Sequence, residues 1–336
     1  MLIAIFAPYS VTLDFTSNNC ILGLSPMDDI TDYPFRVICK EFGADILYTE
    51  FIAAEGINHN AFKGKRKMLF TDEMRPIGIQ IFGADKNELL KCLAVVERAE
   101  PDFIDLNWGC PVRKVADKGA GSGMLKDTHK LLEITESIVR QSHFPVTVKT
   151  RIGFDKENIC IETLAQQLQD VGVAMLAIHG RTRSQMYTGQ ANWSIIGAVK
   201  KNTNIRIPIY GNGDIDSPNK ALQAKQLYDV DGILIGRAAI GNPWIFEQTK
   251  RLMNGLPERS ISIRERVDIC RRHLQMSIDF FGEHTGLIVM KRHYASYFKS
   301  LPNFKQFRTP LFNNSSRDQV YDILNQITDY YSPNDF

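Results

Sequence analysis

The sequence lacks several features that would assign it to a common class of protein. Its six cysteines lie far apart and form no Cys-x-x-Cys pair, which argues against a zinc ribbon, an iron–sulfur cluster and a secreted disulfide scaffold. No run of about 18 apolar residues is present to span a bilayer, and the apolar segment 1–7 lacks the basic residues that open a signal peptide. A reducing, cytoplasmic setting without membrane association is therefore expected.

Acidic residues are missing from one long stretch, between Glu283 and Asp318. Over the whole chain 40 basic and 38 acidic residues nearly balance. Residues 1–248 carry 27 basic and 29 acidic side chains, whereas residues 249–336 carry 13 and 9. Positive charge is thus concentrated at the C-terminal end, where it would suit an anionic partner.

In the stretch without acidic residues, basic and aromatic side chains alternate. The basic residues are Lys291, Arg292, Lys299, Lys305, Arg308 and Arg317, and the aromatic residues are Tyr294, Tyr297, Phe298, Phe304, Phe307 and Phe312. In one interpretation the basic groups bind RNA phosphates and the aromatic rings stack on bases. In the other, the rings fill the core of amphipathic helices and the charges are solvated. The pattern alone favours neither.

Short runs of β-forming residues alternate with helical patterns from Cys20 onward. Eight runs are candidate strands: 20–27, 45–53, 76–83, 103–110, 146–153, 175–180, 207–213 and 232–238. Helices between them are indicated by capping residues that precede periodic apolar residues, namely Thr31 or Asp32, Asp85, Asp127 or Thr128, and Ser217. Residues 1–19 are expected to be a lead-in, and the basic segment 54–75 a variant element or a mobile loop.

Eight βα units over roughly 230 residues match a (β/α)8 TIM barrel. A doubly wound sheet is the alternative, but no Gly-x-Gly-x-x-Gly follows the first strand, and the glycines at 119–123 have the wrong spacing. After Phe246 only helical patterns follow, over 262–281, 287–300 and 317–331. The predicted organisation is an α/β barrel over residues 1–248 and an all-helical domain over residues 249–336.

Polar side chains stand at the carboxyl ends of the candidate strands, and these ends meet on one face of a barrel. The fourth strand ends in Asn107 and Cys110, and other strands end in residues 25–28, Gln80, Lys149, Arg151, His179 and Arg181. An isolated cysteine in such a turn is usually one more buried hydrophobe. So many polar strand ends together favour an active site instead.

Glycine-bearing turns follow the last two strands, at Gly211-Asn212-Gly213-Asp214 and at Gly236-Arg237. Barrels often bind phosphate at these two loops, because glycine lets backbone N–H groups approach an anion and arginine adds charged hydrogen bonds. A phosphate-bearing cofactor or substrate is expected there. A flavin mononucleotide in this position would extend its ring toward Gln80 and Lys149.

Six segments occur in the order SPMDDITDYPFR (25–36), DLNWGCP (105–111), VKTRIG (148–153), IHGRTR (178–183), GNGD (211–214) and IGRA (235–238). Together they resemble the tRNA-dihydrouridine synthases, and the similarity covers most of the chain. The resemblance implies an FMN barrel with a C-terminal helical tRNA-binding domain, which reduces the C5=C6 bond of tRNA uridines with NADPH as the reductant. It implies no metal, and a monomer is expected.

The resemblance also implies a role for individual residues. Cys110 would be the proton donor, because a thiol with an ordinary pKa near 8.5 is mostly protonated at neutral pH. The flavin contacts would be Pro26, Met27, Asp28, Gln80, Lys149, His179, Asn212, Gly213, Asp214, Gly236 and Arg237. The target base and the RNA would be bound by Asn107, Arg151, Arg181, Lys291, Arg292 and Arg308.

Three positions depart from the family pattern: Ser25, Trp108 and Tyr210. Trp108 and Tyr210 are large, and both are expected near the barrel mouth, where they would reshape the substrate pocket. Two other functions stay open on the residues alone. One is an FMN barrel that acts on a small molecule, as a dihydroorotate dehydrogenase or an ene-reductase does; the other is a catalytically idle RNA-binding module.

Overall fold

The computed structural model describes residues 14–16, 20–59 and 62–332, and most of the expected lead-in lies outside them. Within these residues nine parallel strands form one sheet in the order β1-β9-β8-β7-β6-β5-β4-β2, with β3 also paired to β4. They are β1 (Ile21–Leu24), β2 (Leu47–Tyr48), β3 (Ile52–Ala53), β4 (Ile77–Phe82), β5 (Phe103–Trp108), β6 (Val146–Arg151), β7 (Met175–His179), β8 (Ile209–Asn212) and β9 (Gly232–Ile235).

The sheet closes between its first and last positions. Leu24 N–H donates to the Ile46 carbonyl at 3.1 Å, and Asp45 N–H donates to the Leu22 carbonyl at 2.7 Å, which joins β1 to the start of β2. The predicted eight-position barrel is therefore confirmed, and the doubly wound alternative is wrong. The second predicted strand is divided into β2 and β3, which pair with opposite ends of β4.

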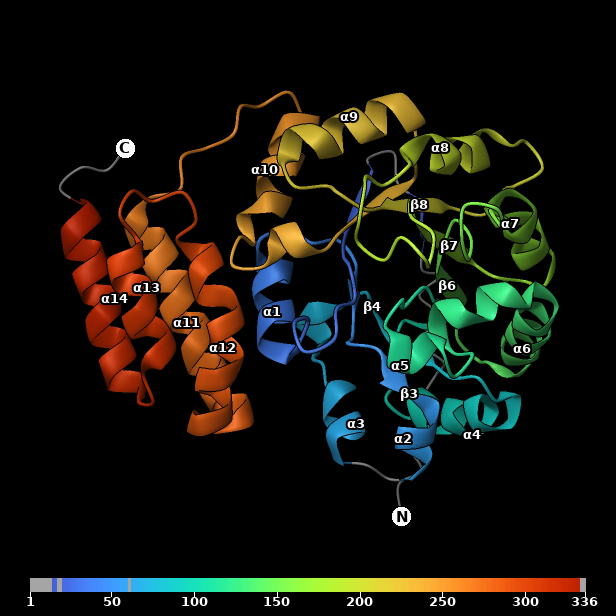
Figure 1. Cartoon of the computed structure of the whole chain (residues 1–336), viewed down its shortest axis with the longest axis horizontal. Coiled ribbons are helices and arrows are strands. Elements are labelled where there is room, and N and C mark those ends of the chain that lie inside the picture. The colour runs from blue at the N-terminus through green and yellow to red at the C-terminus, as the bar shows by residue number, and fades with distance from the viewer. Residues whose placement is uncertain (1–13, 17–19, 60–61, 333–336) are drawn as a thin grey trace, which may run out of the picture.

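Helices cover the outside of the barrel (Figure 1). They are α1 (Tyr33–Glu41), α2 (Ala54–Asn58), α3 (Phe62–Lys67), α4 (Lys86–Glu97), α5 (Arg113–Ala116), α6 (Thr128–Gln141), α7 (Ile161–Asp170), α8 (Trp193–Lys201), α9 (Pro218–Tyr228) and α10 (Trp244–Met253). The side chains of Asp32, Asp85, Asp127 and Ser217 accept hydrogen bonds from first-turn N–H groups, so these four predicted caps are confirmed. The segment 54–75 holds the short helices α2 and α3, which fits the predicted variant element.

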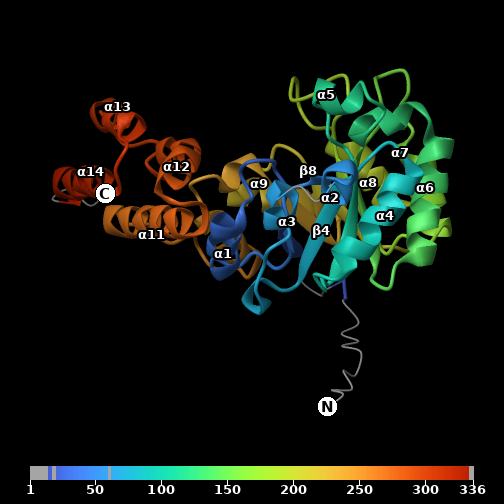
Figure 2. The same ribbon diagram turned by 90° about the horizontal axis from the view of Figure 1, so that it is seen from below.

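The C-terminal region is a separate group of helices at one side of the barrel (Figures 1 and 2). It contains α11 (Ile263–Phe281), α12 (Glu283–Tyr297), α13 (Lys305–Asn313) and α14 (Arg317–Tyr331), which share their own hydrophobic core. The predicted boundary at residue 248 falls inside α10. Ile245 of α10 packs in the barrel core, whereas Trp244 packs in the helical core.

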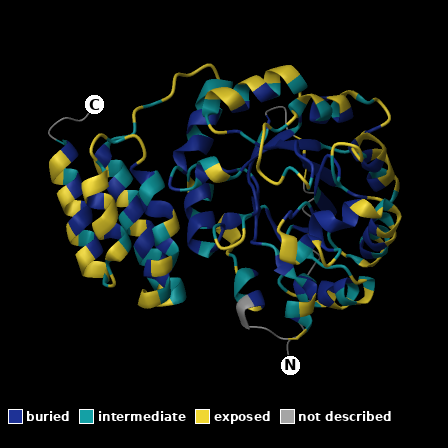
Figure 3. Cartoon of the chain, in the orientation of Figure 1, coloured by how far each residue is buried: buried dark blue, intermediate teal, exposed yellow. Residues whose placement is uncertain are grey.

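The aromatic residues of the basic stretch lie inside that helical core. Tyr294, Tyr297 and Phe298 are at most 1% exposed, and Phe304 and Phe312 pack against them half-buried. The interpretation in which these rings stack on RNA bases is therefore wrong. The basic residues Lys299, Lys305 and Arg308 are exposed. Buried and exposed positions alternate along the helices of this region (Figure 3).

The helical region is fixed to the barrel mainly through α1, which packs against α11. Tyr33 of α1 stacks on Phe280 of α11 with ring centroids 4.9 Å apart, and Glu41 pairs with Arg272. In α12, Arg292 donates to the Asp29 carbonyl at 2.5 Å in the loop after β1. The two parts are thus joined by apolar and polar contacts along α1 and at the loop after β1.

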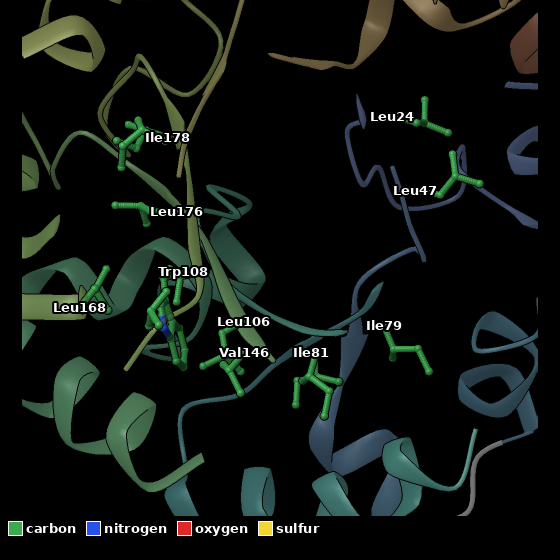
Figure 4. Close-up of a cluster of buried hydrophobic side chains, with 14 of the residues drawn as sticks. Leu24, Leu47, Ile79, Ile81, Leu106, Trp108, Val146, Leu168, Leu176 and Ile178 are labelled. Atoms are coloured by element: carbon green, nitrogen blue, oxygen red, sulfur yellow. The ribbon is translucent and has the colours of Figure 1, made fainter. Parts of the chain in front are cut away.

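Side chains alternate between the barrel interior and the surrounding helices. In β5, Asp105 and Asn107 face inward, whereas Leu106 and Trp108 face the helices and belong to the outer core (Figure 4). The Trp108 indole N–H donates to Thr135 Oγ1 of α6 at 3.2 Å, and the ring is fully buried. Trp108 therefore does not lie at the barrel mouth, and that prediction is wrong.

Tyr210 is likewise absent from the mouth. It faces the barrel interior one layer below Asn212, among Tyr48, Phe103 and Leu234, and its hydroxyl donates to the Phe15 carbonyl at 3.0 Å. Both large departures from the family pattern are thus packing residues.

A substitution at Trp108 tests this placement. Trp108→Phe removes one buried hydrogen bond and part of a buried ring, so it should lower the free energy of unfolding by about 1–2 kcal/mol. Urea unfolding followed by circular dichroism measures the difference. An unchanged midpoint would contradict the buried position.

No helix within residues 14–16, 20–59 and 62–332 combines the length and apolarity needed to cross a membrane.

Candidate active site

A cavity of about 1690 Å³ opens at the carboxyl ends of the strands. It is lined by the loops after β1, β5, β7, β8 and β9, by the end of β6, and by parts of α9, α11 and α12. Fourteen of the predicted site residues line it: Pro26, Met27, Asp28, Asn107, Cys110, Lys149, Arg151, His179, Arg181, Asn212, Gly213, Asp214, Gly236 and Arg237. The predicted residues outside its lining are Gln80, Lys291, Arg292 and Arg308.

Cys110 lies in a tight turn directly after β5. Asn107 Oδ1 accepts hydrogen bonds from the N–H groups of Gly109 and Cys110, both at 2.9 Å. The Cys110 carbonyl accepts from Ser122 Oγ at 2.8 Å, so the turn is held from both sides. Cys110 is 7% exposed, and burial raises the pKa of its thiol. At neutral pH Cys110 therefore carries a proton that it can donate.

Beneath the cavity lies a layer of buried polar side chains. Gln80 is fully buried; its Nε2 donates to Asp105 Oδ2 at 2.6 Å, and its Oε1 accepts from Asn107 Nδ2 at 2.9 Å. Burial raises the pKa of Asp105 to about 6, although hydrogen bonds from Gln80 and Thr147 act in the opposite direction. Gln80 thus fixes the Asn107 amide by a hydrogen bond on the side away from the cavity.

Lys149 enters the cavity from β6, beside Asn107 in the sheet register. Its Nζ donates to Asn212 Oδ1 at 3.0 Å. Burial and the neighbouring Arg151 guanidinium lower the pKa of Lys149 to about 8. The ammonium is held without a carboxylate in hydrogen-bond contact among the described residues, which leaves its charge available to an anionic ligand.

The guanidinium groups of two arginines at the mouth bind other groups of the protein. Arg151 donates to the carbonyls of Gly109, Thr182 and Met186, at 2.8, 2.9 and 2.8 Å. Arg181 is 2% exposed and pairs with Asp214 at 2.6 Å. Both side chains therefore hold the loops that surround the cavity.

The turn after β8 requires a glycine at position 213. Gly213 adopts φ +120°, and a Cβ there would lie 2.7 Å from atoms of both Ala191 and His179. Arg237, after β9, is exposed and reaches Asp214 at 3.3 Å. Burial and the charges of Arg151 and Lys149 lower the pKa of His179 well below its ordinary value, so its ring is neutral.

Comparison with known proteins decides the family. The family model described as dihydrouridine synthase matches residues 23–331. The chain belongs to the dihydrouridine synthase family. It is 35% identical over 300 residues to the tRNA-dihydrouridine synthase B of Pseudomonas syringae pv. tomato, covering 89% of this chain and 88% of that protein. It is 34% identical over 317 residues to a probable tRNA-dihydrouridine synthase of Rickettsia prowazekii, covering 94% and 95%.

Among solved structures, the chain resembles a histamine dehydrogenase from Rhizobium sp. 4-9, with a TM-score of 0.51 and 12% identity over 76% of this chain and 49% of that one. At this identity the likeness shows the barrel fold alone. Membership of the dihydrouridine synthase family makes the chain an oxidoreductase and a flavoprotein.

Three cavity residues of this dihydrouridine synthase were not identified from the sequence. Tyr187, in the loop after β7, is 53% exposed, and the guanidinium carbons of Arg151 and Arg237 lie 5.7 and 5.2 Å from its ring centre. Lys299 and Arg266 reach the cavity from the helical region. Lys299 belongs to the basic stretch, whereas Tyr187 carries no signal apart from its place after a strand end.

The three predicted RNA contacts of the helical region lie away from the cavity lining. Arg292 binds the Asp29 carbonyl and is also 3.3 Å from its carboxylate, so it joins α12 to the loop after β1. Arg308 is exposed beside the Phe312 ring, 5.6 Å from its centre. Lys291 is half-buried on α12.

One group of carboxylates at the mouth has the spacing of a metal site. Oxygens of Asp28, Asp29 and Glu50 lie within 4.8 Å of one another. Lys67 of α3 pairs with Asp28, and its Nζ lies 3.1 Å from Glu50 Oε1. The lysine ammonium therefore takes the place that a cation would take between these two carboxylates.

Proposed function

We propose that this protein is a tRNA-dihydrouridine synthase that uses FMN and NADPH to reduce the C5=C6 bond of tRNA uridines to 5,6-dihydrouridine. The observation that carries the proposal is the protonated Cys110 thiol in a fixed turn at the mouth of a barrel of this family. The proposal includes action as a monomer in the cytoplasm.

The residues at the mouth fit a flavin mononucleotide. A ligand pocket usually measures about 300–1,000 Å³, so a cavity of about 1690 Å³ has room for a flavin and a flipped base together. Asn212, Gly213, Gly236 and Arg237 would hold the phosphate, and Lys149 and His179 would face the ring. A bound flavin supplies the hydride that adds to C6 of uracil.

Cys110 would complete the addition. Hydride at C6 leaves negative charge toward C5, and the thiol proton transferred to C5 neutralises it. Because burial raises the pKa of Cys110, the thiol keeps this proton at and above neutral pH. Asn107 lines the cavity, and the amide N–H that it does not donate to Gln80 would hold a carbonyl of the base.

The helical region would bind the rest of the tRNA. Its basic residues Lys299, Lys305 and Arg308 are exposed, and Lys299 also lines the cavity, so positive charge extends from the mouth onto this region. Because the aromatic rings between them are internal, we assign the RNA contacts to charge and not to base stacking.

Two measurements test the proposed function. The purified protein should be yellow and should release FMN on denaturation. Its steady-state oxidation of NADPH should depend on added tRNA that lacks dihydrouridine, and with that tRNA NADPH should be oxidised faster than NADH. Dihydrouridine mapping in tRNA from cells with and without the protein should reveal missing positions. Faster reduction of a free pyrimidine or an enone would favour the small-molecule enzyme, and tRNA binding without turnover would favour the idle module.

A further inference from the structure

Four buried side chains form a continuous chain of hydrogen bonds that ends at Cys110. Thr147 Oγ1 donates to Asp105 Oδ1, and Gln80 Nε2 donates to Asp105 Oδ2 at 2.6 Å. Asn107 Nδ2 then donates to Gln80 Oε1 at 2.9 Å, and Asn107 Oδ1 accepts from the Cys110 N–H at 2.9 Å. Thr147, Asp105 and Gln80 are fully buried, and Asn107 is 5% exposed.

The ionised carboxylate of Asp105 fixes which group donates and which accepts in each of these hydrogen bonds. A carboxylate only accepts hydrogen bonds, so Gln80 must turn its N–H groups toward Asp105 and its oxygen toward Asn107. Asn107 must then donate to that oxygen, which turns its own oxygen toward the turn. With either amide flipped, two donors or two acceptors would face each other in a buried site. Asp105 therefore determines the orientation of a side chain that it does not touch.

We propose that Asp105 is a positioning residue for the proton donor: through Gln80 and Asn107 it fixes the turn that carries the Cys110 thiol. The role rests on the proposed function, in which Cys110 donates the proton.

The surroundings of Asp105 support this role over a purely structural one. No ion pair within the described residues includes Asp105, and its hydrogen-bond partners are the neutral Gln80 and Thr147. Burial raises the pKa of Asp105 by more than the positive charge of Lys149 lowers it. The pKa of Asp105 is raised to about 6, so burying its charge has a net cost despite Lys149. Fixing the amides of Gln80 and Asn107 gives this charge a role that stability alone does not.

The test compares Asp105→Asn with a control, Thr249→Val, which removes a buried threonine hydroxyl from α10. The asparagine keeps the size of the side chain but can point either its oxygen or its nitrogen at Gln80. Asp105→Asn should keep the wild-type flavin content and unfold no earlier than the wild type. In flavin-free protein, alkylation of Cys110 by iodoacetamide, followed by peptide mass spectrometry, should become several-fold faster, whereas Thr249→Val leaves it unchanged.

The same variants are then measured as reduced holoenzyme. Mixed without oxygen with tRNA that lacks dihydrouridine, Asp105→Asn should reoxidise its flavin about tenfold more slowly than the wild type. In a Cys110→Ala background the same substitution should slow the reaction less than twofold, because a residue that acts through the thiol has no effect once the thiol is gone.

Two results would overturn the positioning role. One is an unchanged alkylation rate in Asp105→Asn, which is independent of any reaction. The other is an equal slowing in both backgrounds, which would mean that Asp105 acts elsewhere. Failure of the proposed function would look different: Cys110→Ala alone would match the wild type, or reduced holoenzyme would not be reoxidised by tRNA. Gln80→Leu, which breaks this series of hydrogen bonds at its middle, should likewise speed the alkylation of Cys110 and slow flavin reoxidation only when Cys110 is present.

Discussion

Cys110→Ala is expected to lower the rate of dihydrouridine formation by about 10²–10⁴-fold, the usual contribution of a positioned general acid. Flavin content and the rate of flavin reduction by NADPH should stay at wild-type values, because the turn is held by backbone groups of Gly109 and Cys110 that alanine retains. Separate rapid-mixing measurements of flavin reduction and of reoxidation by tRNA distinguish the two effects.

The matched control is Cys160→Ala. Cys160 is a partly exposed thiol at the start of α7, away from the cavity lining, so its removal should leave both half-reactions unchanged. Near-normal product formation by Cys110→Ala would remove Cys110 from the mechanism. Since burial raises the pKa of the thiol, the Cys110-dependent rate should also persist as the pH rises past the ordinary thiol range.

Much of the barrel follows from the sequence because strand periodicity and helix caps are local signals. Asp32, Asp85 and Asp127 each precede a helix and cap it as predicted. The same strand periodicity also indicates which side of β5 Trp108 faces. It shares its side of β5 with Leu106, so it faces the helices, whereas Asn107 faces the barrel interior. Counting alternate residues would have corrected the prediction.

Other features depend on contacts that a sequence does not record. The helix α13 has Pro310 in its interior, a residue that usually ends a helix, so the segment gave no helical signal. Whether Tyr297 faces RNA or the core depends on how α11, α12 and α14 pack together. Gln80 was expected at a strand end that faces the site, but it lies inside β4, two residues before the end, and donates and accepts hydrogen bonds below Asn107.

Fourteen of the predicted site residues thus line one cavity at the strand ends, whereas Gln80 lies outside its lining. The sequence indicates which residue types meet at the mouth, because all parallel strands end there. It does not reveal that the guanidinium groups of Arg151 and Arg181 bind loop carbonyls and Asp214, since these partners lie 31 to 42 positions away, after other strands.

Lys149→Met is expected to change flavin binding and protein stability in opposite directions. The pKa of Lys149 falls from 10.5 to about 8 on folding. The buried ammonium therefore destabilises the flavin-free protein below pH 8. This destabilisation disappears as the pH rises from about 8 to 10.5, because the folded protein then holds Lys149 without its proton. Methionine removes this destabilisation, so at pH 7 the flavin-free variant should gain about 1–3 kcal/mol of unfolding free energy. Urea unfolding at pH 7 and pH 10 should reveal a gain that shrinks at the higher pH.

The same substitution should weaken FMN binding by about 10-fold or more at pH 7, because it removes a positive charge from a largely buried site. In the wild type the affinity should decline above about pH 8 as Lys149 loses its proton, whereas in Lys149→Met it should not change over that range. Fluorescence titration of flavin-free protein with FMN measures both, and Lys130→Met, on the exposed face of α6, serves as the control. Equal FMN affinity in Lys149→Met and the wild type at pH 7 would mean that the ammonium does not face the flavin, and the placement of the ring beside β6 would have to be abandoned.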